Sequence, residues 1–295
     1  MFTKALILLG LILVPLSAGA RVKVVSSTSD LAYFATVIAG GHVDITTIAS
    51  PKRDPHFVEV RPSFMMKMSR ADVALKVGLG LDRWLDGIID GSRNSDIVIV
   101  DCSKYIKPLE VPSFKADARY GDLHQQGNPH YWLGPDFVPS ILRAITEGLA
   151  AVDPERAAEF DANRRNFLAE FDSSLTELTE RAAVLRGEEI IFYHNSWPYL
   201  SEFTGLNVLG FVEQFPGVPP SPSHIKKLSE LVLKRGVKVI AIAVYFDTRV
   251  PEKIAAATGA RVVTLYPSLG AREKNESYLD FLDANLSLLK EAFDE

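Results

Sequence analysis

Cysteine is almost absent from this chain of 295 residues, in which Cys102 is the only one. A single cysteine makes no internal disulfide, so no disulfide framework holds the fold together. Cys102 ends an apolar run, and we expect it to be a buried residue without a chemical role. A chain of this length has room for two domains of ordinary size and a real hydrophobic core.

An excess of positive charge is missing as well. The chain has 32 Lys and Arg against 37 Asp and Glu, which gives a net charge of −5 at pH 7. No stretch is rich in Lys and Arg, whereas a nucleic-acid surface would need such a stretch. We therefore expect no nucleic-acid partner. Hydrophobic residues at 47% and charged residues at 23% are typical of a soluble globular protein.

Long apolar runs are confined to the first 20 residues. Lys4 is followed by the apolar segment Ala5 to Leu16 and by Ser17-Ala18-Gly19-Ala20, which has the A-x-A form of a cleavage site. The apolar segment is short for a membrane span, and no cysteine near the cleavage site would accept a lipid. We predict that residues 1–20 are a cleaved signal peptide. The mature chain would carry −5 − 1 = −6 and lie outside the cytoplasm, most simply in a bacterial periplasm.

Strand-like and helical segments alternate over the rest of the sequence, and this alternation predicts two parallel sheets flanked by helices. We expect an α/β lobe of about four strands at 21–150, a long linking helix at 151–187 and a second such lobe at 188–295. The linking helix has Asp153 as a candidate N-cap and Gly187 as its stop. Its apolar residues recur at steps of three, four or seven: Phe160, Phe167, Phe171, Leu175, Leu178, Ala182 and Leu185.

Three of the six histidines occupy loops that follow predicted strands. His56 follows the second strand, His130 ends a long Pro- and Gly-containing loop at 107–134, and His194 follows the first strand of the second lobe. Ligands of open α/β sheets bind at the carboxyl ends of strands, so these histidines are expected to meet between the lobes. Three neutral imidazoles on separate loops make a metal site. The spacing alone leaves this interpretation about as probable as three unrelated histidines.

Short motifs decide between these interpretations. They are Asp54-Pro55-His56, Pro62-Ser63, Gly80-Leu81-Asp82-Arg83-Trp84, Asn128-Pro129-His130-Tyr131-Trp132-Leu133-Gly134-Pro135, Tyr193-His194, Trp197-Pro198-Tyr199 and Thr258-Gly259-Ala260-Arg261-Val262-Val263. In combination they resemble the zinc/manganese solute-binding proteins of ABC transporters (ZnuA/TroA-like), over essentially the whole mature chain. The resemblance implies two lobes joined by one long rigid helix, with a metal ion between them. His56, His130 and His194 match the three histidine ligands of that family.

The fourth ligand is the main departure from the family pattern. Pro267 stands where many members have a carboxylate, Asn128 replaces an aspartate, and the histidine-rich loop of zinc members is reduced to 122–126, which contains His124. The fourth position is then water, Asp247 or Glu213, with Asp247 favoured by its place after a strand. We expect His124 to be solvated, with assistance in metal capture from the loop as the alternative. His42 is expected in a turn after Gly40-Gly41, and His224 at a helix start where it packs or faces solvent.

Zinc is the expected ion, and manganese is a weaker alternative, because three nitrogen donors with few carboxylates suit Zn²⁺ better than Mn²⁺. We expect a monomeric periplasmic carrier that captures Zn²⁺ and passes it to an ABC permease in the inner membrane, without catalytic residues. A periplasmic zinc-dependent hydrolase is a rival, although no His-Glu-x-x-His or Gly-x-Ser-x-Gly motif occurs. A metal-sequestering surface protein is a second rival.

Overall fold

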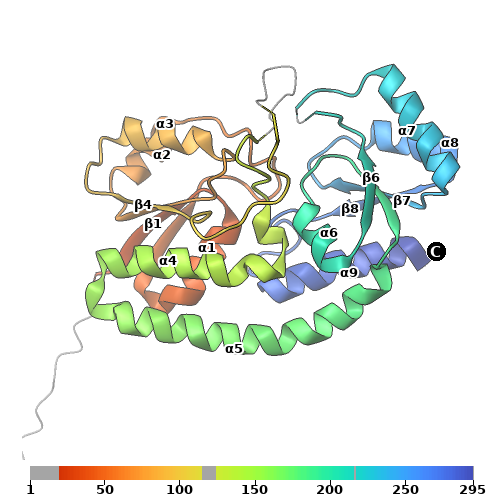
Figure 1. Cartoon of the computed structure of the whole chain (residues 1–295). Helices are drawn as coiled ribbons and strands as arrows, with labels where there is room; N and C mark the ends of the chain where they lie inside the picture. Colours follow the sequence, from red (N-terminus) through yellow and green to blue (C-terminus); the bar gives the residue numbers. More distant parts are fainter. Residues whose placement is uncertain (1–19, 115–123, 216, 295) are drawn as a thin grey trace, which may run out of the picture.

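The computed structural model of the protein describes residues 20–114, 124–215 and 217–294 (Figure 1). The predicted signal peptide lies outside the described residues except for Ala20, and so does part of the 107–134 loop. Among the described helices, none is long and apolar enough to cross a membrane.

The N-terminal lobe is built on a four-stranded parallel sheet with the order β2-β1-β3-β4. Most residues of the central strands β1 and β3 are buried, as expected of strands covered on both faces. The elements are β1 Val22–Ser26, α1 Ser29–Ala39, β2 Val43–Thr47, α2 Pro62–Met68, β3 Val73–Lys76, α3 Arg83–Ser92, β4 Val98–Asp101 and α4 Val138–Val152.

The C-terminal lobe repeats this plan with the parallel order β6-β5-β7-β8. All five residues of β7 are buried, so this strand lies at the centre of the lobe. The elements are β5 Glu189–Phe192, α6 Pro198–Thr204, β6 Asn207–Phe211, α7 Pro222–Arg235, β7 Val239–Ala243, α8 Arg249–Thr258, β8 Arg261–Leu265 and α9 Tyr278–Asp294. The two parallel sheets flanked by helices confirm the predicted fold class.

The predicted linking helix is α5, Ala157–Ala182, which runs along one side of both lobes (Figure 1). It is shorter than 151–187, because 3₁₀ turns at Pro154–Arg156 and Ala183–Leu185 form its two ends. The predicted apolar stripe faces the protein: Phe160, Phe171, Leu178, Ala182 and Leu185 are buried, and Phe167 and Leu175 are half-buried. The exact division into 21–150, 151–187 and 188–295 stays a prediction.

One hydrophobic core continues through both lobes. It joins α1, α4 and one face of the first sheet to α9 and one face of the second sheet, with α5 packed along it. Separate smaller cores lie under α2 and α3 and under α7 and α8. Both sheets are therefore covered on both faces, and their strand order reverses beside β1 and β5. In such sheets, ligands bind beyond the carboxyl ends of the strands at that point.

Candidate metal centre

His56 is held by the aspartate two residues before it. Asp54 Oδ1 accepts a hydrogen bond from the His56 backbone N–H at 3.0 Å and lies 2.6 Å from His56 Nδ1. Pro55 between them fixes its own φ, and its carbonyl accepts a 2.8 Å hydrogen bond from Trp84 Nε1. Burial raises the pKa of Asp54, but its hydrogen bonds with His56 outweigh this and hold the pKa below its ordinary value. The carboxylate is therefore ionised and keeps His56 in one orientation.

His130 is held in the same way, with an amide in place of the carboxylate. Asn128 Oδ1 accepts from the His130 backbone N–H at 3.1 Å and lies 2.9 Å from His130 Nδ1. Asn128 is itself fixed, since its Nδ2 donates to the carbonyl of Asn195 at 2.8 Å and its own carbonyl accepts from Tyr199 Oη at 2.6 Å. Asn128 thus supports the backbone and the ring of His130 in the way that Asp54 supports His56.

The ring of His194 is held by a residue that follows another strand. Glu213 follows β6, and its Oε2 lies 2.7 Å from His194 Nδ1, while its Oε1 accepts from the Gly217 backbone N–H at 2.9 Å. Both carboxylate oxygens of Glu213 are therefore engaged, and the predicted alternative of Glu213 as a ligand is replaced by a role behind the ring. The side chain of Phe246 packs beside His194, with ring centroids 5.7 Å apart.

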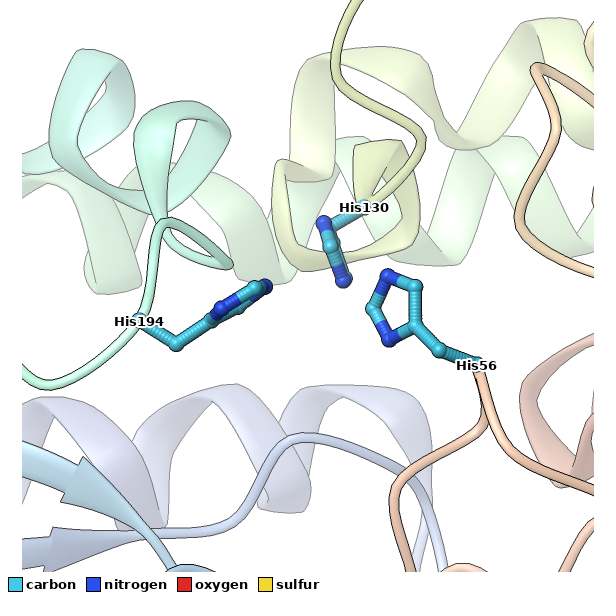
Figure 2. A group of neighbouring side chains, drawn as sticks. All are labelled: His56, His130 and His194. Carbon is cyan, nitrogen blue, oxygen red and sulfur yellow. The ribbon is translucent and has the colours of Figure 1, made fainter. Parts of the chain in front are cut away.

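These three partners fix the tautomer of each ring. A carboxylate or amide oxygen only accepts hydrogen bonds, so Nδ1 is the donor in all three contacts, and Nε2 is the ring nitrogen of each histidine that is left for a metal ion. Among the described residues, one group of possible metal ligands is formed by His56, His130 and His194, whose ligand atoms lie within 4.8 Å of one another. Figure 2 shows the three rings turned toward a common space from separate loops.

The three rings of the site are buried. His56, His130 and His194 are 9%, 1% and 5% exposed. Burial lowers the pKa of His130 well below 6.5, and the neighbouring histidines lower it further. His130 Nε2 is buried and has no hydrogen-bond partner among the described residues. An unpaired lone pair that faces two others is what a metal ion with nitrogen ligands requires.

The expectation for His124 is wrong. This residue is buried, not solvated, and its Nε2 lies 3.0 Å from His56 Nε2. Burial lowers the pKa of His124 to about 3, with further contributions from His56, His194 and Arg83. His124 follows a part of the 107–134 loop that has no periodicity, so no pattern in the sequence predicts this contact.

Asp247 is not brought to the three histidines. Its half-exposed carboxylate is bonded by the Arg249 backbone N–H at 2.9 Å and by the guanidinium of Arg249, and these bonds hold its pKa at about 2. Pro267 contributes its carbonyl to Trp132 Nε1 at 2.9 Å. The other two histidines lie elsewhere: His42 pairs with Glu159, and the ring of His224 contacts the carbonyl of Phe211.

The proteins that this chain resembles in sequence are described as zinc-uptake or metal-binding proteins. A family model described as zinc-uptake complex component A, periplasmic, matches residues 24–292. A putative metal-binding protein of Treponema pallidum is 24% identical over 276 residues, which cover 92% of this chain and 87% of that protein. The high-affinity zinc uptake system protein ZnuA of Haemophilus ducreyi is 24% identical, with 96% of each chain covered.

Solved structures agree with these sequence relatives. A crystal structure of ZnuA superposes with a TM-score of 0.80 at 27% identity, covering 92% of this chain and 99% of that one. Some relatives are longer: the zinc-binding protein AdcA of Streptococcus pyogenes is 22% identical, and this chain matches only 56% of its length.

Proposed function

Since this chain belongs to the family of periplasmic zinc-uptake components, we propose that it captures Zn²⁺ and delivers it to the permease of an ABC transporter. The observation that carries the proposal is the convergence of His56, His130 and His194, with ligand atoms within 4.8 Å of one another. We assign these three residues as ligands. The ion is cargo, so the protein needs no catalytic residue and acts through binding and release.

Zinc is favoured over manganese by the donor set. Three imidazole nitrogens suit Zn²⁺, whereas Mn²⁺ prefers more oxygen ligands. The nearby oxygens of Asp54, Asn128 and Glu213 are each engaged by a histidine Nδ1. Such partners raise the basicity of the ligating nitrogen and fix the ring, which strengthens binding of a borderline ion such as Zn²⁺.

Competition between the two ions tests this proposal. Metal-free protein is titrated with Zn²⁺ in the presence of excess Mn²⁺, and binding is followed by calorimetry. We expect one Zn²⁺ per chain and displacement of Mn²⁺ by Zn²⁺. Preference for Mn²⁺ would refute the choice of ion, and no binding of either would refute the carrier function. Asp247→Ala is a matched variant: the Asp247–Arg249 pair predicts unchanged affinity, while a loss would restore Asp247 as the fourth ligand.

Delivery and location need separate experiments. Zinc-loaded protein is added to proteoliposomes that contain an ABC permease with its ATPase from the same organism, and ATP-dependent zinc uptake is measured. Uptake that does not depend on this protein would contradict the proposed partner. N-terminal sequencing of the protein from the periplasmic fraction checks cleavage after Ala20. Size-exclusion chromatography with light scattering checks that the carrier is a monomer, as expected.

A further inference from the structure

His124 is a fourth buried imidazole beside the three proposed ligands. Its side chain belongs to the segment just before Asn128-Pro129-His130, and it is 7% exposed. The Gly127 backbone N–H donates to the His124 carbonyl at 3.2 Å, and the Asn128 backbone N–H donates to the Leu109 carbonyl at 2.8 Å. These hydrogen bonds tie the His124 turn to the loop that carries His130.

His124 lies at ligand-like spacings from His56 and His130, although the group of described residues whose ligand atoms all lie within 4.8 Å of one another comprises His56, His130 and His194. Two nitrogens bound to one tetrahedral zinc ion lie about 3.3 Å apart, given zinc–nitrogen bonds of about 2.0–2.1 Å. The Nε2 atoms of His124 and His56 are 3.0 Å apart. The centroids of the His124 and His130 rings are 6.2 Å apart, close to the 6.0 Å between His130 and His194. His124 therefore lies as near to one proposed ligand as the proposed ligands lie to each other.

The contact between His124 and His56 is one that a bound metal ion would displace. His56 Nδ1 donates to Asp54, so His56 Nε2 has only a lone pair to offer. The contact at 3.0 Å then requires that neutral His124 donates from its Nε2–H. When an ion takes the lone pair of His56, this contact is lost, and His124 regains its own lone pair at Nε2 if its proton moves to Nδ1. No net proton is released by this change of tautomer.

The carboxylates considered for the fourth position are engaged elsewhere. The carboxylates of Asp54 and Glu213 support rings, and Asp247 is bonded to Arg249. Resting on the function proposed above, we propose that His124 is the fourth ligand and completes an all-nitrogen site for the transported ion. A site with four imidazoles and no carboxylate discriminates further against Mn²⁺, so His124 is also a determinant of ion selectivity.

The test counts histidines on the bound metal. X-ray absorption of the zinc-loaded wild-type protein is expected to fit four imidazole ligands, and that of His124→Ala three. We expect His124→Ala to lower zinc affinity by more than about 10-fold and to change the visible spectrum of the Co²⁺-loaded protein. His42→Ala is the matched control, because His42 lies outside the site on Glu159, and it should change neither measurement.

The outcomes separate this inference from the proposed function. Three imidazoles in the wild type, or wild-type affinity and spectrum in His124→Ala, would overturn the role of His124 and leave the carrier function standing. A wild-type protein that binds no metal would overturn both. The imidazole count on the wild type does not depend on how well the variant folds.

Discussion

Asp30 is a buried carboxyl group at the boundary between the lobes, and it predicts an unusual dependence of stability on pH. It lies in the first turn of α1, is 0% exposed, and its Oδ1 accepts a 2.9 Å hydrogen bond from the Leu269 backbone N–H of the other lobe. Its Oδ2 has no hydrogen-bond partner among the described residues. Burial raises the pKa of Asp30 from 3.8 to about 7, against the smaller opposing effect of the Leu269 hydrogen bond.

The sign and the size of this pH dependence follow from proton linkage. Between pH 4 and pH 7 the folded protein keeps the proton of Asp30, while the unfolded chain has released it, so the free energy of unfolding falls as the pH rises. A shift of about three pKa units corresponds to about 4 kcal/mol. The helix N-terminus contributes at most about 2 kcal/mol in favour of the anion, so the desolvation cost prevails.

Asp30→Asn removes this titration but keeps an oxygen for the Leu269 N–H. Urea denaturation of wild type and variant at pH 4.5 and pH 8 measures the change. From pH 4.5 to pH 8, the free energy of unfolding of the variant should rise by roughly 3–4 kcal/mol relative to that of the wild type. Asp44→Asn, at an exposed position in the edge strand β2, is the control and should show no such gain. Parallel pH dependence of Asp30→Asn and wild type would refute the reasoning.

Three further perturbations test the site and the core. Replacement of His56, His130 or His194 by alanine should lower zinc affinity by more than 100-fold each by calorimetry, because each supplies one of three converging nitrogens; wild-type affinity in any of them removes that residue from the site. Glu213→Ala should cost about 10–100-fold, because it frees the ring of His194, and an unchanged affinity would contradict the supporting role. Phe171→Ala should lower the free energy of unfolding in urea by about 3–5 kcal/mol, because this side chain is 1% exposed; a loss below 1 kcal/mol would mean that α5 is not held by its apolar stripe.

The fold was largely predictable from periodicity. The stripe from Phe160 to Leu185 identified the helix that spans both lobes, and the alternating segments gave both sheets. With the 3₁₀ turns Pro154–Arg156 and Ala183–Leu185 included, the helical run lies between the expected N-cap Asp153 and the expected stop Gly187, but the sequence pattern does not distinguish 3₁₀ turns from α-helix.

The site was predictable where a motif fixes local geometry. In both Asp54-Pro55-His56 and Asn128-Pro129-His130, the residue before proline bonds the backbone and ring of the histidine after it. The roles of Glu213 and His124 depend on contacts between residues 19 and 68 positions apart. Neither pairing leaves a periodic or spacing pattern in the sequence, so only the tertiary structure reveals them.

The contacts between the lobes also predict how far they move when metal binds. Tyr278 Oη donates to the Trp132 carbonyl at 2.7 Å, Trp132 Nε1 donates to the Pro267 carbonyl at 2.9 Å, and Tyr199 Oη donates to the Asn128 carbonyl at 2.6 Å. Trp132 also packs against His130, with ring centroids 5.3 Å apart. Opening the lobes would leave several such buried groups unpaired, at about 1–3 kcal/mol each. With α5 packed along both lobes (Figure 1), a wide opening is disfavoured even without metal.

Small-angle X-ray scattering measures this directly. The radius of gyration, about 19 Å for a compact chain of this length, should change by less than about 1 Å between metal-free and zinc-loaded protein. Exchange of metal must then proceed through the loops that carry the histidines, because these can move while the hydrogen bonds between the lobes stay intact. A larger contraction on zinc binding would show that the lobes close like a hinge and that the contacts of Trp132 and Tyr278 form only in the loaded state.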